Sequence, residues 1–443
     1  MMNSNSAHDT ANRNTPPETG KSRLLTVPQA LAQARREPYP YERWLMAKLL
    51  RMAGSPPIRF QLWNGDLIEL EDVPARFTIH LRDHKALLRL LGNPNLAFGD
   101  LYSAGRIEVD GNLTDLMEAL YRTADRAQHS RPKWLEALWR NQAPRSTDVT
   151  QARENIHHHY DLGNTFYRLW LDKAEMQYTC AYYESEDLTL EQAQLAKLEH
   201  VCRKLRLRPG MVVAEAGCGW GGLSRYMARH YGVRVRAYNI SREQLAYARE
   251  EADRQGLDHL IEYVEDDYRN IEGEYDAFVS IGMLEHVGKE HFPAMSSLIK
   301  RVLKPEGLAL LHSIGRNQAM RLNAWIEKRI FPGAYPPSIS EFMDICEAGN
   351  FSVLDVENLR LHYAQTLAHW MDRFQAHRQE VVKLYDANFV RAWELYLAGS
   401  TAAFRAGSLQ LFQVLFTHGD NNGLPNTRQD LYRKSAVPED GSS

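Results

Sequence analysis

Short apolar runs alternate with helical patterns over the C-terminal two thirds of the chain, from about residue 154 to about residue 419. Runs bounded by turn residues predict strands, whereas apolar residues spaced three and four apart predict helices. The predicted strands are Met211–Ala216, Arg234–Asn239, Ile261–Glu265, Tyr275–Ile281, Gly307–Ile314 and Ser352–Leu359. The helices predicted between them are Leu223–Tyr231, Arg242–Gln255 and Ala294–Leu303. This alternation predicts an α/β fold with a parallel, doubly wound sheet, in which ligands bind beyond the carboxyl ends of the strands.

The region before this alternation has the pattern of a small α+β domain without a catalytic constellation. Its predicted strands are Arg59–Trp63, Leu67–Leu70, Phe77–Leu81 and Gly105–Val109, and its predicted helices are His84–Leu91 and Leu113–Ala127. The pair Asn64-Gly65 favours a hairpin turn, so the first two strands are expected to be antiparallel neighbours.

A loosely amphipathic helix is predicted over Tyr41–Met52, within a region that reads as largely helical from Val27 to Gly54. Its apolar face is predicted to contain Tyr41, Leu45, Leu49 and Met52. Two interpretations are open. Basic residues outside that face suit an anionic membrane surface, and the apolar face equally suits burial in a domain core.

Composition shifts divide the chain into five parts. Residues 1–25 are rich in Asn, Ser, Thr and Pro and are expected to form a disordered tail. Residues 26–130 form the small N-terminal domain, which we expect to be associated with lipid or membrane. Residues 131–150 read as a linker, residues 151–420 as the catalytic domain and residues 421–443 as a C-terminal tail.

The 443 residues carry a net charge of −3, and 25% of them are charged, which gives no indication of nucleic acid as a partner. The four cysteines have no CxxC spacing and read as reduced thiols of a cytosolic protein. No apolar run approaches about 18 residues, so any work on a membrane is expected at its inner surface. A homodimer is one arrangement that the sequence allows.

The stretch Glu215-Ala216-Gly217-Cys218-Gly219 follows a predicted buried strand and precedes a helix. Glycine lets the backbone turn sharply and approach a ligand, and Glu215 suits a ligand with a positive centre or an amine. Phosphate-binding loops more often carry the Lys of the P-loop pattern, and that pattern is not present here. A strand followed by E/D-x-G-x-G resembles the first turn of S-adenosylmethionine-dependent methyltransferases. A tight turn without a ligand is the alternative.

Polar residues follow the other predicted strands at the same sheet edge. Asn239 and Gln244 could reach a ribose or a carboxylate, while Asp267 and Tyr268 could bracket an adenine ring. Glu285 and His312 come after the fourth predicted strand and near the end of the fifth. One such residue alone is more often structural, but two beside a glycine-rich turn favour a catalytic site.

Two features upstream have a structural and a chemical interpretation. The run His157-His158-His159 does not favour a metal site, because adjacent residues cannot all face one ion, so no metal is predicted. Cys180 could be a nucleophile, but no sequence feature assigns it a base, so a buried, inert thiol is expected.

Taken together, the motifs resemble the cyclopropane-fatty-acyl-phospholipid synthase family, which includes mycolic acid cyclopropane synthases and related lipid methyltransferases. The matching motifs occur in the order HYDLGN, MQYTCAYY, EAGCGWGG, GMLEHVG, LKPEG, HSIG and IFPG, within residues 154–419. Residues 58–120 resemble the N-terminal domain of the bacterial phospholipid-acting members. The resemblance implies a Rossmann-like class I methyltransferase sheet with an added small α+β N-terminal domain.

The resemblance also implies an activity, which is transfer of a methylene group from S-adenosylmethionine to the cis double bond of an unsaturated phospholipid in the membrane bilayer. The residues implied to hold S-adenosylmethionine are Tyr178, Thr179, Glu215, Gly217, Gly219, Asn239, Gln244, Asp267 and Tyr268. Those implied to bind a bicarbonate ion are Cys180, Glu285, His312, Ile314 and Tyr363, with Cys180 and Ile314 acting through the backbone. Tyr160 would lie near both ligands. Trp325, Ile326, Ile330 and Phe331 read equally as acyl-chain lining and as core.

Several positions depart from the usual family pattern, among them Glu215, where the family usually has Asp, and Ser313, where it usually has Thr. None removes a proposed catalytic group. A methyl-branched or methylene fatty acyl product from the same cation stays open. The sequence is also compatible with a methyltransferase that acts on a soluble small molecule and with a non-catalytic lipid-binding protein.

Overall fold

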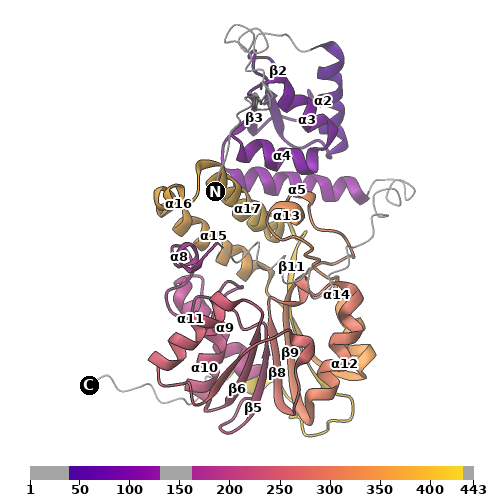
Figure 1. Cartoon of the computed structure of the whole chain (residues 1–443). Helices are drawn as coiled ribbons and strands as arrows, with labels where there is room; N and C mark the ends of the chain where they lie inside the picture. Colours follow the sequence, from indigo (N-terminus) through magenta and orange to yellow (C-terminus); the bar gives the residue numbers. More distant parts are fainter. Residues whose placement is uncertain (1–38, 130–161, 433–443) are drawn as a thin grey trace, which may run out of the picture.

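The computed structural model describes residues 39–129 and 162–432 (Figure 1). Its larger part is a seven-stranded sheet with the strand order β10-β11-β9-β8-β5-β6-β7. All neighbours are parallel except β11, which runs antiparallel between β9 and β10. The strands are β5 (Val212–Ala216), β6 (Arg234–Asn239), β7 (Ile261–Glu265), β8 (Tyr275–Ile281), β9 (Leu303–Gly315), β10 (Phe351–Asn358) and β11 (Gln410–His418).

The predicted doubly wound class and all six predicted strands are confirmed, but β11 was not predicted. Every residue of β11 except His418 is buried, so its sequence shows no alternation between apolar and polar residues. A fully buried strand cannot be distinguished from a buried helical segment by periodicity alone. The expectation of a wholly parallel sheet was therefore wrong at this one strand.

Helices cover both faces of the sheet. One face packs against α9 (Leu190–Lys204), α10 (Gly222–Tyr231) and α11 (Arg242–Arg254), and the opposite face packs against α12 (Phe292–Val302) and α14 (Ile339–Gly349). Neighbouring residues of β5 show the division, since Val213 belongs to the first core and Ala214 to the second.

A layer of further helices lies over the carboxyl ends of the parallel strands (Figure 1). It contains α8 (Asn164–Arg168), α13 (Ala324–Arg329), α15 (Arg360–Ala376), α16 (Arg378–Leu384) and α17 (Ala387–Ala406). The remaining short helices are η1 (Tyr268–Asn270), η2 (Leu284–His286), η3 (Lys289–His291) and α18 (Gln429–Tyr432).

The N-terminal domain is built on a four-stranded sheet with the order β2-β1-β3-β4. Its elements are α2 (Pro40–Met52), β1 (Ile58–Gln61), β2 (Leu67–Ile68), β3 (Phe77–Leu81), α3 (His84–Gly92), α4 (Pro94–Ser103), β4 (Ile107–Asp110) and α5 (Leu113–His129). The predicted hairpin is confirmed, because β1 and β2 pair antiparallel. Helix α4 was not predicted.

Helix α2 is buried on a different face from the one that was predicted. Tyr41 and Met52 are 55% and 52% exposed, whereas Glu42, Met46 and Leu50 are buried. The Glu42 carboxylate lies 2.6 Å from Nε2 of the partly buried His84, and this contact puts a charged residue on the inward face. The apolar pattern alone therefore pointed to the wrong face, although the core interpretation of the helix is confirmed.

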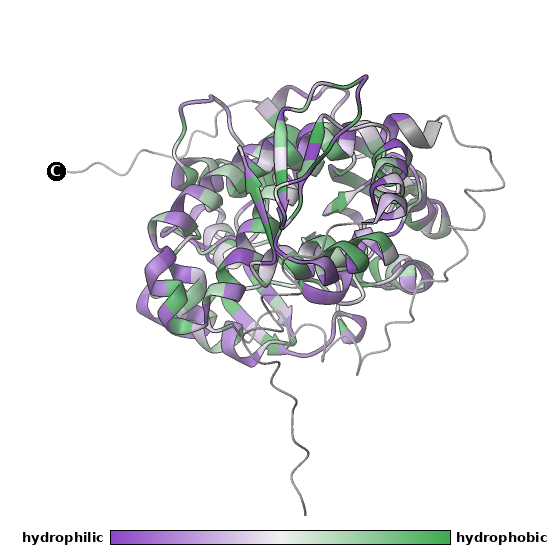
Figure 2. Ribbon diagram, turned by 90° about the horizontal axis from the view of Figure 1, so that it is seen from above, coloured by the Kyte–Doolittle hydropathy of each residue, from purple (hydrophilic) through white to green (hydrophobic). Residues whose placement is uncertain are grey.

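One hydrophobic core runs from the N-terminal domain into the helical layer of the larger domain. Arg391 of α17 donates to the carbonyls of Tyr102 (2.6 Å) and Ile107 (2.8 Å), and its guanidinium lies 4.3 Å from the Tyr102 ring. On α13, Arg329 forms two 3.0 Å contacts with Asp100. Viewed from above, hydrophobic residues concentrate inside the molecule and hydrophilic ones on the outer helices (Figure 2).

The two domains pack closely together at Gly99 in α4. A Cβ atom there would lie 2.4 Å from three ring atoms of Trp325 on α13. We expect Gly99→Ala to lower the free energy of unfolding by about 1–3 kcal/mol, since the buried indole would have to move. Thermal denaturation of the whole protein measures this. Gly92→Ala in α3 is the matched control, because a Cβ at Gly92 meets nothing within 4 Å. Equal melting temperatures for the two variants would contradict this account of the interface.

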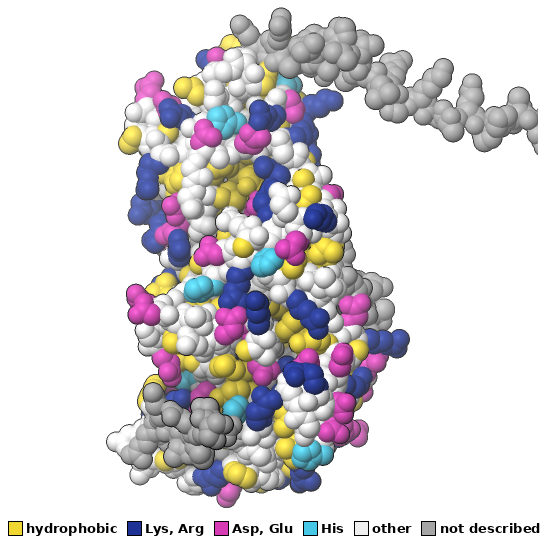
Figure 3. Space-filling model, turned by 90° about the vertical axis from the view of Figure 1, so that its left-hand side faces the viewer, with side chains coloured by type: hydrophobic (Ala, Val, Ile, Leu, Met, Phe, Trp, Pro, Cys, Tyr) yellow, Lys and Arg dark blue, Asp and Glu magenta, His cyan; other side chains and the backbone are white. Residues whose placement is uncertain are grey.

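On the face shown in Figure 3, basic and acidic side chains are intermingled with small hydrophobic areas. Over the described ranges, no helix combines the length and the apolar character that crossing a bilayer requires.

Candidate active site

The turn after β5 has the backbone shape that close approach of a ligand requires. Gly217 (φ +82°) and Gly219 (φ +53°) adopt left-handed conformations, which residues with a Cβ rarely occupy. A Cβ on Gly219 would meet no atom within 4 Å, whereas one on Gly217 would lie 3.2 Å from the side chain of Met283. The turn therefore borders open space at Gly219 and touches the loop after β8 at Gly217.

The Glu215 carboxylate beside this turn is buried, and its ionisation is sensitive to a nearby positive charge. Glu215 is 3% exposed and accepts a hydrogen bond from the Ser224 hydroxyl. Burial raises the pKa of Glu215 to about 7, although the Ser224 hydroxyl and the charges of Lys197 and Arg225 act in the opposite direction. A carboxylate in this state is stabilised when a cation binds beside it.

The end of β6 is joined directly to the glycine turn. The Asn239 amide nitrogen donates to the side-chain oxygen of Gln244 (2.9 Å) and to the carbonyl of Gly219 (3.2 Å). Its amide oxygen accepts from the backbone nitrogens of Ile240 (2.8 Å) and Ser241 (3.2 Å). Gly219, Asn239 and Gln244 are thus held in one network.

Asp267 and Tyr268 follow β7 at the same edge of the sheet, and both are buried. The Asp267 carboxylate accepts from the backbone nitrogen of Arg269 (3.0 Å), so it caps η1. The Arg269 guanidinium lies 5.4 Å from the Tyr268 ring. The Tyr268 hydroxyl is buried and has no hydrogen-bond partner within the part of the chain that the structure describes.

The segment Tyr178–Cys180 lies against the loop after β8 and is held by a buried lysine. Lys197 of α9 is completely buried, and its ammonium donates to the Thr179 hydroxyl (3.0 Å) and to the side-chain oxygen of Gln177. Burial lowers the pKa of Lys197 to about 8. A Cβ on Gly282, in the loop after β8, would lie 2.9 Å from the Thr179 methyl group. Thr179 therefore packs against the loop that precedes Glu285.

Glu285 and His312 are both buried at the carboxyl ends of the central strands. Glu285 accepts from the Ser313 hydroxyl (2.7 Å) and from the backbone nitrogen of Ile314 (3.4 Å), so it bonds the two residues that follow His312. Burial raises the pKa of Glu285. Burial and the charges of Lys197 and Lys204 lower the pKa of His312 to about 3, so its ring is neutral.

Backbone contacts bring Ile314, Cys180 and Tyr363 to this same place. Ile314 is the register partner of Leu411, whose carbonyl accepts from the backbone nitrogen of Leu359 (2.8 Å). The Leu359 carbonyl in turn accepts from the backbone nitrogen of Tyr363 (3.1 Å) and lies 3.9 Å from the Cys180 sulfur. Contacts through Ser313, Leu411 and Leu359 therefore connect the neighbourhoods of the five residues that were predicted to surround an anion.

Aromatic rings connect the two halves of the site. The Trp370 ring lies 5.3 Å from the ring of Tyr178, on the glycine-turn side, and 5.9 Å from the ring of Tyr363, on the Glu285 side. The hydroxyls of Tyr178 and Tyr396 are 2.9 Å apart. Electron-rich ring faces in a dry site can stabilise a positive charge.

Burial bears on two interpretations that the sequence left open, namely the chemistry of Cys180 and the role of the apolar residues after β9. Cys180 is completely buried, which raises the pKa of its thiol, and its sulfur lies 3.1 Å from the Ala181 carbonyl. It has the character of the inert thiol that was expected. Trp325 and Ile330 are 4% and 5% exposed, and Trp325 packs against the N-terminal domain, which favours the core interpretation for these two. Ile326 and Phe331 are only partly buried, so both interpretations stay open for them. Tyr160 and the three adjacent histidines lie outside the described residues.

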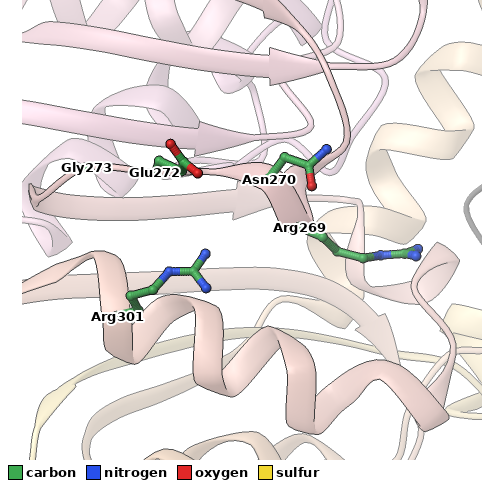
Figure 4. A pocket seen from close by; sticks show the side chains of 5 residues that line it. All are labelled: Arg269, Asn270, Glu272, Gly273 and Arg301. Atoms are coloured by element: carbon green, nitrogen blue, oxygen red, sulfur yellow. The ribbon is translucent and has the colours of Figure 1, made fainter.

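Two cavities lie away from this cluster. One of about 540 Å³ is lined by Arg269, Asn270, Glu272, Gly273 and Arg301, beside α12 (Figure 4). Another of about 450 Å³ lies between residues 111–115 and the outer turns of α15 and α17. Neither contains a residue that was predicted to bind a ligand. In the described part of the chain, no group of His, Cys, Asp or Glu is arranged to hold a metal ion.

Three residues of the site were not predicted from the sequence, namely Lys197, Trp370 and Gln413. A signal existed for Lys197, because it shares the spacing of the buried residues Ala193, Leu198 and Val201 on α9. Gln413 is a polar residue in the apolar run of β11, but the sequence does not show that this strand pairs it with His312. Nothing in the sequence distinguishes Trp370 from an ordinary core residue.

The residues at the glycine turn fit S-adenosylmethionine. The open space at Gly219 admits a ligand, the buried Glu215 carboxylate suits its positive charge, and the amides of Asn239 and Gln244 offer polar contacts. These residues lie at the carboxyl ends of the strands, where doubly wound sheets bind ligands in general.

Comparison with known proteins agrees with this site. The family described as Mycolic acid cyclopropane synthetase matches residues 147–414, and a domain of unknown function matches residues 45–132. A probable fatty acid methyltransferase of Pseudomonas putida is 36% identical over 85% of this chain and 96% of its own length. The cyclopropane-fatty-acyl-phospholipid synthase of Escherichia coli K12 is 43% identical over 60% of this chain and 68% of its own.

Solved structures show the same relationship. The cyclopropane synthase MmaA2 of Mycobacterium tuberculosis matches with a TM-score of 0.58 and 31% identity, covering 61% of this chain and 99% of that one. The mycolic acid cyclopropane synthase CmaA1, complexed with SAH and CTAB, gives a TM-score of 0.56 and 31% identity over 60% of this chain and 97% of its own. With its fold, its glycine turn and a family match that spans more than half its length, the chain belongs to the mycolic acid cyclopropane synthetase family and is an S-adenosylmethionine-dependent methyltransferase.

Proposed function

We propose that this enzyme transfers a methylene group from S-adenosylmethionine to the cis double bond of an unsaturated phospholipid acyl chain and forms a cyclopropane ring. The observation that carries the proposal is the segment Tyr178–Cys180. Thr179 accepts from Lys197, whose charge acts on Glu215 beside the glycine turn, and it packs against the loop that precedes Glu285. Cys180 lies beside the Leu359 carbonyl, which accepts from Tyr363. The name of the Escherichia coli relative supports the substrate class.

The residues around the glycine turn bind and orient S-adenosylmethionine. Glu215, Gly217, Gly219, Asn239 and Gln244 hold the cofactor at the ends of β5 and β6, and Tyr178, Thr179, Asp267 and Tyr268 complete its surroundings. When bound, S-adenosylmethionine supplies an electrophilic methyl group. A cis double bond is a weak nucleophile, so the residues must hold it close to this methyl group and exclude water.

The aromatic rings stabilise the positive charge that methyl transfer leaves on the acyl chain. Tyr363 and Trp370 lie in the buried helical layer, with Phe404 4.7 Å from the Tyr363 ring. Their ring faces attract a cation, and their bulk excludes the water that would otherwise quench it.

Ring closure requires loss of a proton from the new methyl group. We propose that a bicarbonate ion beside Glu285, His312 and Tyr363 takes this proton as the general base, with backbone groups of Cys180 and Ile314 completing its site. The buried Nε2 of His312, which has no hydrogen-bond partner in the described residues, supports a polar ligand at this point.

The names of other relatives favour an alternative outcome, in which the product is a methyl-branched or methylene fatty acyl chain. The probable fatty acid methyltransferase of Pseudomonas putida and the tuberculostearic acid methyltransferase of Mycobacterium tuberculosis, which is 34% identical, are both named for methyl transfer to fatty acids. A methyl-branched, unsaturated product arises from the same cation when the proton leaves from a carbon of the chain, and a methylene product arises when a hydride shift precedes loss of the methyl proton. The place of the base relative to the chain decides between these products.

Transfer of an isotope label from S-adenosylmethionine to lipid tests the proposed substrate. Purified protein is incubated with S-adenosylmethionine labelled at the methyl carbon and with vesicles of cis-monounsaturated phospholipid. We expect label in the lipid fraction with these vesicles and none with saturated phospholipid. We also place the enzyme at the membrane surface, so it should sediment with the vesicles. Binding of S-adenosylmethionine without labelling of lipid would favour a soluble substrate or a non-catalytic protein.

We expect the affinity for S-adenosylmethionine to increase as the pH rises from about 6 to about 7.5. The raised pKa of Glu215, about 7, means that the carboxyl is largely protonated at the lower pH and ionised at the higher one. The cofactor carries a net positive charge and binds the ionised form better, so the change approaches about tenfold. Titration calorimetry at several pH values measures it.

Glu215→Gln is the control for this pH dependence, because it keeps the shape of the side chain and removes the titrating proton. We expect weaker binding and a flat pH profile for the variant. A wild-type affinity that does not change over this range would contradict the role of Glu215 as the group that senses the cofactor charge.

A further inference from the structure

Three polar residues form a row across the sheet, leading away from the proposed base. His312 on β9 is the register partner of Gln413 on β11, and Gln413 is the register partner of Glu357 on β10. Directly opposed residues of neighbouring strands place their side chains on the same face of a sheet. The row therefore lies on one face, where α9 covers it with His200 and Lys204.

The outer end of the row is an ion-pair cluster. The Glu357 carboxylate lies 2.7 Å from Nε2 of His200 and 2.6 Å from the ammonium of Lys204, which also lies 3.1 Å from Asp355. Gln413 stands between this cluster and His312. It is completely buried, so its amide is shielded from bulk water.

The hydrogen bond between Gln413 and His312 fixes the position of the ring proton. The amide nitrogen of Gln413 lies 3.1 Å from Nδ1 of His312. The amide oxygen of Gln413 is buried without a hydrogen-bond partner among the described residues. An amide nitrogen can only donate, so in this orientation of the amide Nδ1 accepts and carries no proton. Because the buried ring is neutral, its single proton is on Nε2.

Nε2 is the ring nitrogen of His312 that is left for a ligand to contact. His312 is 2% exposed, and Nε2 has no hydrogen-bond partner within the described ranges, in contrast to Nδ1. A buried ring nitrogen that donates is completed by an acceptor, and an anion is the strongest acceptor. In this tautomer Nε2 cannot take a proton, so His312 is not itself the base.

We propose that Gln413 is a positioning residue that holds His312 in the Nε2–H tautomer, so that the imidazole donates to an anion in the active site. The catalytic consequence rests on the proposed function. The proton lost from the new methyl group goes to an oxygen of the bound bicarbonate, and the C–H electron pair closes the ring. His312 orients that anion, and Gln413 orients His312.

Nitrogen NMR of the histidine rings tests the tautomer without reference to activity. In ¹⁵N-labelled protein, with the His312 signals assigned from a His312→Asn variant, we expect a protonated Nε2 and an unprotonated Nδ1. In Gln413→Glu the new carboxylate accepts from the ring, so the proton should move to Nδ1. A proton on Nδ1 in the wild-type protein would overturn the proposal, whether or not the enzyme makes a lipid product.

Gln413→Met gives a second reading that does not bury a new charge. It removes the donor, so we expect a mixture of tautomers and a fall in kcat of roughly 10- to 100-fold, with the KM for S-adenosylmethionine unchanged. Gln410→Met is the matched control. Gln410 lies on the same strand, is 4% exposed and bonds Gly407 and Asn358 instead of His312. Equal loss of kcat in both variants, with the Nε2–H tautomer retained, would show a merely structural role and overturn the proposal.

Discussion

Replacing Glu285 by Gln is expected to lower turnover about 100- to 10,000-fold while leaving the binding of S-adenosylmethionine essentially intact. The carboxylate accepts from Ser313 (2.7 Å) and Ile314 (3.4 Å), which are part of the cluster around His312 and not of the glycine turn. Glutamine keeps the volume, but it introduces a donor amide and removes the negative charge. A bicarbonate in this cluster would then be held in a different orientation, and its basicity would change.

The control for Glu285 is a carboxylate away from the cluster. Glu199 on α9 accepts from the hydroxyls of Tyr226 and Tyr231, both at 3.0 Å, and Glu199→Gln should leave turnover close to that of the wild-type enzyme. Turnover and cofactor affinity are measured for both variants. Loss of cofactor binding in Glu285→Gln would place this residue in the wrong half of the site.

The largest expected effect on stability comes from an ion pair beneath the glycine turn. Arg225 and Glu175 are 1% and 5% exposed, and their charged atoms are 2.7 Å apart. We expect Arg225→Met to lower the free energy of unfolding by about 3–5 kcal/mol, because Glu175 would stay buried without its partner. Burial raises the pKa of Glu175 even with Arg225 present, which indicates the cost of this carboxylate. Denaturant unfolding of the whole enzyme measures the change.

A double variant separates the pair from ordinary packing. Arg225→Met combined with Glu175→Leu removes both charges, so it should recover much of the stability that the single variant loses. Arg225 also donates to the carbonyl of Trp220 (2.7 Å), so recovery is not expected to be complete. A double variant less stable than Arg225→Met would contradict the explanation by an unpaired buried charge.

The sequence allowed close prediction of strands whose ends are marked by a change of residue type. The bounds of β6, β7 and β8 agree with the prediction to the residue, because turn or helix patterns follow each run directly. Prediction failed where burial is complete or where a charged residue is buried. Strand β11 has no alternation, and the pair of Glu42 with His84 reverses the apparent face of α2.

The same distinction applies to the site. Glu285 and His312 could be proposed because each comes near the carboxyl end of a predicted strand, where doubly wound folds bind ligands. Gln413 could not, since it reaches His312 only through the pairing of β11 with β9, and that pairing depends on a strand that the pattern does not show. The spacing of α9 could have predicted that Lys197 is buried, but not its contact with Thr179, which lies 18 residues away in the chain.

The most direct test of the central claim follows the fate of the transferred methyl group. The purified enzyme is given S-adenosylmethionine with a trideuterated methyl group and vesicles of a cis-monounsaturated phospholipid, and the fatty acids are released and analysed by mass spectrometry. We predict a gain of one CD₂ unit with loss of the double bond, since the proton removed by the base comes from the new methyl group. Retention of all three deuterium atoms in a methyl-branched chain would contradict ring formation.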